Sequence, residues 1–304
     1  MKAAAIPADS EAANPAVARR SVPALISDLV KARLTFLVLV TTLVGFCMGL
    51  QDGPVDYWLL FNCMFGTALS AAGAAALNQL IERHADAKME RTRTRPLPTG
   101  EMSAPAAATI GVVGSLLGVG LLWLKVTPLA AWVSVATIVS YIAFYTPLKK
   151  VSSLNTIVGA IPGALPPVIG YAATANRIDL IAWTLFLILF LWQLPHFLAI
   201  SWLYREDYLR GGFVMISGRD ATGKETAWKA IVYTLLLIGS TVLPYVLGIN
   251  NVVFLAGAVL LGLAFLYCAI RFQFERNAST ARRLFFASII YLPILLGLLV
   301  FTRS

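Results

Sequence analysis

Charged residues are scarce in this sequence. Asp, Glu, Lys and Arg make up only 13% of its 304 residues, whereas hydrophobic residues make up 59%. A soluble domain normally carries about 25% charged residues, so the composition excludes an ordinary soluble globule. With a mean hydropathy of +0.78, the chain is expected to have lipid as its main solvent.

Cysteine is also rare, and this excludes two further classes of protein. The three cysteines all lie inside apolar runs and none forms a CxxC pair, so neither a disulfide framework nor a cysteine metal site is expected. They are Cys47, Cys63 and Cys268.

The N-terminal region lacks the apolar core of a secretory signal. Its Asp9 and Glu11 also argue against a transit peptide. We therefore expect residues 1–30 to form a disordered cytoplasmic tail. Residues 31–304 then form a single transmembrane domain.

Long apolar runs are abundant instead. Each is near the ~20 residues that a spanning helix needs. Lipid offers the backbone no hydrogen-bond partners, so helices are the expected structure. The fold class is therefore all-α, a polytopic membrane protein with about nine transmembrane helices. The segments are 33–50, 57–80, 103–124, 128–147, 154–174, 180–203, 228–248, 251–271 and 284–302.

Basic residues are distributed unevenly among the loops. With the N-terminus in the cytoplasm, 21 of the 24 Lys and Arg fall on the cytoplasmic side, and only Lys125, Arg177 and Arg303 fall opposite. The positive-inside rule thus predicts a cytoplasmic N-terminus and a C-terminus on the other side. The net charge of +9 is assigned to these loops, and no nucleic-acid partner is expected.

Three oxygen-bearing side chains follow the second apolar segment at intervals of four residues. They are Asn78, Glu82 and Asp86, and on a helix this spacing stacks them along one face. Arg91 and Arg95 come directly after. Magnesium prefers hard oxygen ligands and commonly lies between carboxylates and substrate phosphates. The stretch therefore predicts a site for a metal-bound polyphosphate.

An alternative for this stretch is a polar helix end leaving the membrane, with Glu82 paired to Arg83 or Lys88. The apolar run before it, the arginine cluster after it and a second polar site favour the metal site.

That second site begins inside the sixth apolar segment, which contains Gln193 and His196. Polar residues at membrane depth are costly and are functional candidates by default. Asp207 lies eleven residues after His196, three helical turns on, and so nearly on the same face. The alternative for His196 is a structural hydrogen bond between helices.

Two features accompany the fourth and fifth segments. In YTPLKK (145–150), Pro147 ends the helix and leaves Lys149 placed to contact phosphate, although membrane anchoring accounts fully for Lys150. The glycines and three prolines of 155–173 predict a kinked, closely packed helix.

Together these motifs resemble the UbiA-type membrane prenyltransferases. The resemblance covers about residues 30 to 300 and keeps the order N-x3-E-R-x2-D, R-T-x2-R-P-L, Y-T-P-L-K and a second acidic patch. It implies nine helices, Mg²⁺ as cofactor and an isoprenyl diphosphate as substrate. The implied metal ligands are Asn78, Glu82, Asp86 and Asp207; the implied diphosphate ligands are Arg91, Arg95 and Lys149; the implied catalytic residues are Asp86, His196 and Asp207.

Within that family the stretch WQLPHF (192–197) resembles the members that farnesylate haem, because members acting on quinone precursors usually have an aspartate at the position of His196. Glu206 and Asp207 match the acidic pair of the second motif. The resemblance implies farnesyl diphosphate and protoheme IX as substrates, with His196 positioning haem or assisting a proton and water step. It also implies a bacterial cytoplasmic membrane location with a cytoplasmic active site, and a haem-modifying enzyme or terminal oxidase as partner.

Two alternatives remain open at this point. One is prenylation of a quinone precursor or another lipid acceptor. The other is a transporter, which predicts polar residues near the bilayer centre on several helices. The charged candidates cluster at one membrane face instead, which disfavours transport.

Overall fold

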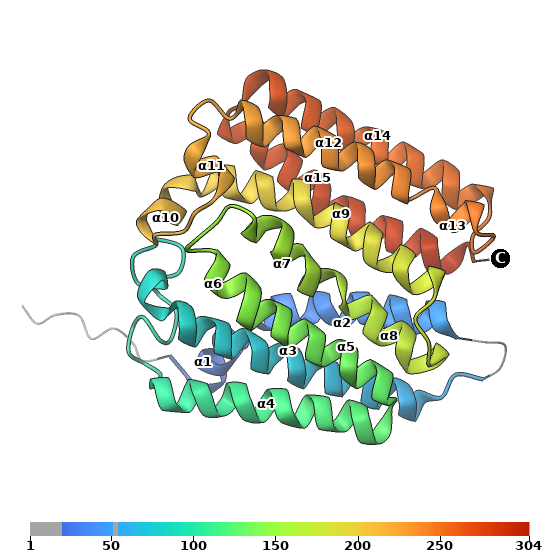
Figure 1. The fold of residues 1–304 in the computed structure, drawn as a ribbon, viewed down its shortest axis with the longest axis horizontal. Coiled ribbons are helices and arrows are strands. Elements are labelled where there is room, and N and C mark those ends of the chain that lie inside the picture. The colour runs from blue at the N-terminus through green and yellow to red at the C-terminus, as the bar shows by residue number, and fades with distance from the viewer. Residues whose placement is uncertain (1–19, 51–53, 304) are drawn as a thin grey trace, which may run out of the picture.

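The computed structural model describes residues 20–50 and 54–303, and helices form nearly all of the regular structure there, as Figure 1 shows. The elements are α1 (Val22–Leu29), α2 (Ala32–Gly49), α3 (Tyr57–Asp86), α4 (Ala104–Lys125), α5 (Pro128–Val139), the π-helix η1 (Ser140–Tyr145), α6 (Thr146–Leu148), α7 (Asn155–Ala164), α8 (Pro166–Ala175), α9 (Leu180–Leu203), α10 (Arg205–Arg210), α11 (Ile216–Arg219), α12 (Lys224–Ser240), α13 (Leu243–Val246), α14 (Val252–Glu275) and α15 (Ala278–Phe301).

Nine stretches within the described ranges are long and apolar enough to cross a membrane. This confirms the predicted fold class of a multi-pass all-α protein. Three of the spans are composite: α5, η1 and α6 form one, α7 and α8 another, and α12 and α13 a third. The α7–α8 span breaks at Leu165 and holds Pro162 inside α7, which agrees with the predicted kink.

Successive spans run in opposite directions along the bundle. Figure 1 shows α1, α6, α10 and α11 at one end of the molecule and the C-terminus at the other. The long connections at about 81–102 and 204–227 therefore meet at the same end, where backbone amides of Glu90 and Arg91 donate to Asp207. We call this the site end.

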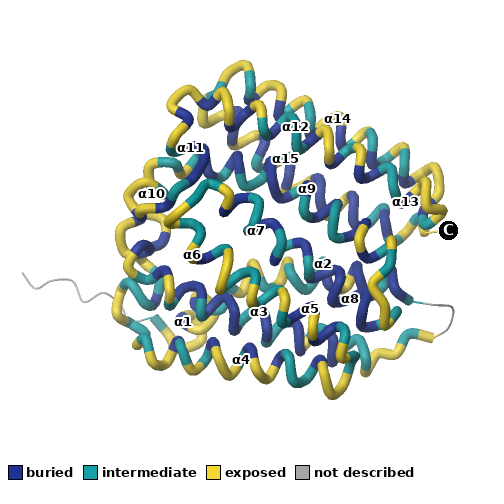
Figure 2. Tube along the Cα trace, in the orientation of Figure 1, coloured by how far each residue is buried: buried dark blue, intermediate teal, exposed yellow. Residues whose placement is uncertain are grey.

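Two spans are mostly buried inside the bundle. The α7–α8 span is 72% buried and α9 is 61% buried, whereas the α4 span is only 22% buried; Figure 2 shows the buried positions gathered on the inward faces. Apolar side chains on the outer helices stay exposed, among them Leu124 and Trp132. Such a surface suits lipid as the surrounding solvent.

Glycine allows a close contact between α2 and α8. A Cβ built on Gly170 of α8 would lie 1.9 Å from the carbonyl oxygen of Thr42 in α2, and one on Gly45 of α2 would lie 1.8 Å from that of Pro167. Small residues at these positions let the two backbones touch, as is common between membrane helices.

The structure corrects the predicted extent of the N-terminal tail. Residues 22–29 form α1, with Pro23 in its first turn, a position for which the fixed backbone angle of proline is suited. Leu29 is fully buried against Ala76 and Ala107. An apolar residue four positions after Leu25 gives α1 a buried face, which explains why the ordered chain begins earlier than expected. The rest of the expected tail, residues 1–19, lies outside the described residues.

Candidate active site

Asn78, Glu82 and Asp86 lie in the last turns of α3, and we call these three side chains the oxygen ladder. Asn78, Glu82 and Asp86 are 0%, 3% and 1% exposed. The helix is capped at its start by Asp56, whose side chain accepts hydrogen bonds from two backbone amides. From there it continues to Asp86, so the predicted four-residue spacing falls on one regular helix. The three side chains are buried at the site end.

Each ladder residue is paired with a cation from a different part of the chain. The pairs are Lys31 Nζ to Asn78 Oδ1 (2.7 Å), Lys149 Nζ to Glu82 Oε1 (2.7 Å) and Arg95 Nη1 to Asp86 Oδ2 (2.6 Å). Three cations thus face two carboxylates and one neutral amide. Lys149 and Arg95 balance the two carboxylates, so protonated Lys31, whose pKa burial lowers to about 7, leaves one net positive charge. This charge favours binding of an anion that carries several charges.

A π-helix places Lys149 on the ladder. The segment η1 inserts one wide turn into the fourth span, and such turns are frequent at functional sites. Tyr141 and Tyr145 stack there with ring centroids 5.7 Å apart, and the Lys149 ammonium lies 4.5 Å from the Tyr145 centroid. Just after η1, Thr146 Oγ1 accepts a hydrogen bond of 3.0 Å from Asn78 Nδ2. The aromatic pair and the ladder therefore hold Lys149 from two sides.

Lys31 is a site residue that sequence reasoning missed. It stands between α1 and α2 with a left-handed backbone (φ 50°), and its Nζ also donates to Tyr141 Oη at 3.2 Å. The sequence offered one signal, a lysine at the start of the first apolar segment on the same side as the ladder. A lysine in that position is equally expected as a membrane anchor.

The ladder fits a magnesium ion. Asp86 Oδ1 is buried and has no hydrogen-bond partner, and the ladder presents the hard oxygens that Mg²⁺ prefers. Across the described part of the chain, no three His, Cys, Asp or Glu side chains form a complete metal cage by themselves. Magnesium commonly combines one or two carboxylates with substrate phosphates, so the ladder suits a metal that arrives together with a diphosphate.

Asp207 holds a loop, which differs from the prediction that it joins the ladder. Its carboxylate accepts hydrogen bonds from the backbone amides of Glu90 (3.1 Å) and Arg91 (3.3 Å) and pairs with Arg210. Burial opposes ionisation, but the Arg210 and amide hydrogen bonds outweigh it and hold the pKa of Asp207 below its usual value. Asp207 thereby fixes the start of the loop that carries Arg95.

The expected alignment of His196 with Asp207 on one helix is wrong. Helix α9 ends at Leu203, and Tyr204 (φ −114°, ψ 26°) interrupts it before α10 begins. Counting turns across positions 196 to 207 therefore does not give a common face. The two residues also have different partners, because His196 Nδ1 lies 2.7 Å from Ser288 Oγ on α15.

His196 lies in an aromatic sandwich between α9 and α15. Its ring stacks on Trp192 and Phe285, with centroids 5.2 and 5.1 Å away. The Ser288 contact is the interhelical hydrogen bond that was the alternative for this residue. Nε2 has no hydrogen-bond partner within the described ranges. Gln193 points elsewhere, donating to the carbonyl of Ala160 on α7 at 3.3 Å.

Of the three predicted phosphate ligands, two contact the ladder and one does not. Lys149 and Arg95 contact the ladder directly. Arg91 instead packs over the rings of Tyr204 and Tyr208, 5.2 and 5.7 Å from their centroids, beside the Asp207 contact.

Comparison with known proteins decides the family. Residues 38–290 match the model of the UbiA prenyltransferase family. This chain belongs to the UbiA prenyltransferase family. It is therefore an enzyme, a prenyltransferase, as the sequence motifs predicted.

Curated relatives of this prenyltransferase include the protoheme IX farnesyltransferase of Solibacter usitatus, which is 43% identical over 284 residues, covering 91% of this chain and 97% of the relative. That of Opitutus terrae is 41% identical over 277 residues, with 91% and 93% covered. The mitochondrial protoheme IX farnesyltransferase of Arabidopsis thaliana is 37% identical over 277 residues, covering 91% of this chain and 64% of the plant protein.

Solved structures share the fold at low identity. A digeranylgeranylglyceryl phosphate synthase superposes with a TM-score of 0.76 at 17% identity, covering 91% of this chain and 97% of that one. A UbiA homologue from Archaeoglobus fulgidus, bound to GPP and Mg²⁺, superposes with a TM-score of 0.64 at 11% identity, with 90% and 99% covered. The arrangement of spans seen here is thus that of UbiA prenyltransferases.

Proposed function

We propose that this prenyltransferase moves a farnesyl group from farnesyl diphosphate to a vinyl group of protoheme IX, giving haem O and diphosphate. The buried ladder with its three cations is the observation that supports farnesyl diphosphate as the donor substrate. The names of the relatives support haem as the acceptor substrate, since each of those cited is a protoheme IX farnesyltransferase.

The ladder and its cations form the donor site. Asn78, Glu82 and Asp86 would hold Mg²⁺, which neutralises charge on the departing diphosphate when it is bound. When the substrate enters, Arg95, Lys149 and Lys31 turn from the ladder oxygens to the phosphate oxygens. The planar fork of arginine suits bidentate contact with phosphate, and both lysines add point charges. Asp207 acts at a distance by fixing the loop that carries Arg95.

The chemical step needs charge stabilisation and little water. The C–O bond of the allylic diphosphate breaks, and the electron pair leaves with the diphosphate. The vinyl π electrons of haem attack the allylic carbon and form the new C–C bond. A water oxygen adds to the cation left on the porphyrin side chain and loses one proton, which leaves a hydroxyl group. The apolar helices around the site keep other water away from the cation.

His196 is assigned to the acceptor side of the reaction. It is polar within an apolar span, it is stacked between aromatic rings, and its Nε2 has no hydrogen-bond partner among the described residues. A neutral imidazole nitrogen can approach a porphyrin iron or take up a proton. Either role would distinguish this chain from relatives that have an aspartate at this position and act on quinone precursors.

The proposed location is the bacterial cytoplasmic membrane, with the site end in the cytoplasm. The loops and helix ends of that end carry most of the basic residues, including Lys149, Arg210 and Arg276. Positive-inside insertion then places the diphosphate site where water-soluble substrates reach it.

Pigment analysis tests the haem assignment. The protein is expressed in cells whose membranes lack haem O. The haems are then extracted and separated, and their masses are measured by mass spectrometry. We expect a new haem heavier by a hydroxyfarnesyl group, absent with His196→Ala. Unchanged haem together with a prenylated quinone precursor would overturn the proposal in favour of the other acceptor.

A further inference from the structure

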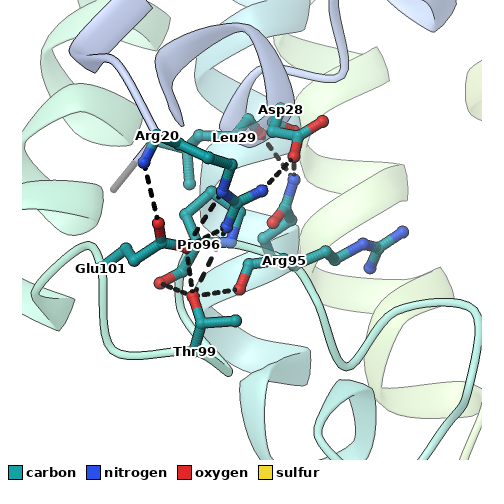
Figure 3. A network of polar contacts seen from close by, with 8 residues as sticks. Arg20, Asp28, Leu29, Arg95, Pro96, Thr99 and Glu101 are labelled. Atoms are coloured by element: carbon teal, nitrogen blue, oxygen red, sulfur yellow. Dashed lines mark hydrogen bonds and ion pairs between the residues drawn. The ribbon is translucent and has the colours of Figure 1, made fainter. Parts of the chain in front are cut away.

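Arg20 lies outside the ladder. It joins the segment that bears Lys31 to the segment that bears Arg95, and these two residues are cations that contact the ladder. Figure 3 shows the network around it. Arg20 Nε donates to Glu101 Oε2 at 3.0 Å, and Arg20 Nη1 pairs with Asp28 Oδ2 at 2.8 Å. Thr99 Oγ1 completes the network by donating to Glu101 Oε2 at 2.8 Å. One guanidinium thus connects α1 with the loop between α3 and α4.

The first segment ends in Lys31. Gln79 Nε2 donates to the carbonyl oxygens of Asp28 (2.6 Å) and Leu29 (2.9 Å), which ties the end of α1 to α3 beside the ladder. The chain then turns through the left-handed conformation of Lys31 to start α2. A residue other than glycine adopts that conformation only at an energetic cost, so surrounding contacts must hold it in place.

The second segment carries Arg95. Thr99 Oγ1 also lies 3.0 Å from the carbonyl oxygen of Arg95, and the Arg95 side chain reaches Asp86. Glu101 is anchored in this segment by Arg20 and Thr99, whose hydrogen bonds lower the pKa of its carboxyl to about 2. The carboxylate is therefore ionised at neutral pH, and the contact with Arg20 is fully charged.

We propose that Arg20 is a positioning residue that clamps the segment bearing Lys31 to the loop bearing Arg95, so that both cations are preset for the diphosphate. This inference rests on the proposed function, because it takes the ladder to be the diphosphate site. Arg20 itself contacts none of the three ladder residues.

The burial and the connections of the Arg20–Glu101 pair favour a larger contribution to stability than that of an isolated surface ion pair. Isolated surface pairs contribute little, but Arg20 and Glu101 are only 28% and 24% exposed and share Thr99 and Asp28 in one network. Lysine and arginine side chains lose much rotamer entropy when they are fixed. Holding the backbones of Lys31 and Arg95 beside the ladder before the substrate arrives leaves only their side chains to reorient on binding, which lowers the ordering cost.

Substitution of Arg20 tests the clamp. The affinity of the full-length protein for farnesyl diphosphate with Mg²⁺ is measured without acceptor, together with its unfolding temperature. We expect Arg20→Ala to raise Kd about fivefold to tenfold, and Arg20→Lys to raise it less. The pair Arg20→Glu with Glu101→Arg should restore part of the affinity that either single change loses.

Arg177→Ala is the matched control. Arg177 pairs with Asp179 at the end of the bundle away from the site, so its loss should leave Kd unchanged. A wild-type Kd in Arg20→Ala, or no coupling in the charge-reversed pair, would overturn the clamp. If the wild-type protein itself fails to bind farnesyl diphosphate with Mg²⁺, the proposed donor site fails instead.

Discussion

Buried carboxylates rarely stand alone, and each carboxylate of the ladder is matched by a cation from outside α3. Burial without such pairing would cost several kcal/mol per charge. The sequence showed Asn78, Glu82 and Asp86 because their spacing is local. It did not show Lys31, which lies 47 positions from Asn78, because a lysine before an apolar run is equally expected as a membrane anchor.

Asp86 is the ladder residue with a free buried oxygen, and it gives the sharpest prediction for a single residue. Asp86→Asn keeps the shape but removes the charge that is proposed to hold the metal. We expect turnover to fall about 100-fold or more, with normal amounts of protein in the membrane. Near-normal turnover would contradict the metal assignment. Glu90→Gln, which changes an exposed carboxylate in the next loop, should retain activity and serves as control.

Lys149 should contribute mainly to binding of the donor. Lys149→Met removes one charge-assisted contact with phosphate, so we expect Kd for farnesyl diphosphate to rise about tenfold. Titration of the purified protein with Mg²⁺ present measures this. Lys150→Met, at the exposed neighbouring position, should have little effect. If both substitutions weaken binding equally, the charge of this end matters and the particular contact of Lys149 does not.

At the scale of elements, helix breaks decide which residues meet. The continuous helix α3 preserved the spacing that the sequence indicated. The break at Tyr204 removed the predicted alignment of His196 with Asp207, and η1 added a π-turn that the periodicity of the letters did not reveal. Both irregularities lie at the site end, where local preferences yield to contacts with other segments.

The α2–α8 contact gives a prediction for stability. Gly170→Ala would place a Cβ 1.9 Å from a backbone oxygen of α2, so the helices must separate. Overpacking of this kind typically costs about 1–3 kcal/mol, and the unfolding temperature in detergent should fall. Gly120→Ala is the control, since its Cβ would meet nothing within 4 Å. Equal stability of the two variants would show that the contact is not tight.

For the whole molecule, hydropathy and charge predicted more than the motifs did. Nine apolar segments and the gathering of charged candidates at one end were read from the sequence and agree with the structure. The turn at Lys31 and the clamp at Arg20 could not be read, since they depend on how α1 packs on α3. Helix α1 was itself missed because its buried face is short and only two leucines mark it.

Orientation in the membrane is a separate prediction at this scale. In a chain with its three cysteines replaced by serine, Lys150→Cys should react with a membrane-impermeant thiol reagent only when the cytoplasmic side is open. Arg177→Cys should react in intact cells. The reverse pattern would place the diphosphate site outside the cytoplasm and contradict the positive-inside reading.

We propose that the ladder residues hold a magnesium-bound prenyl diphosphate that prenylates haem, and one assay tests this directly. Purified protein is incubated with farnesyl diphosphate, haem and Mg²⁺, and released diphosphate and haem products are measured together. We expect one haem carrying a hydroxyfarnesyl group for each diphosphate released. With Asp86→Asn, or with a chelator present, we expect neither product. Diphosphate release while haem stays unmodified, or full product formation by Asp86→Asn, would contradict it.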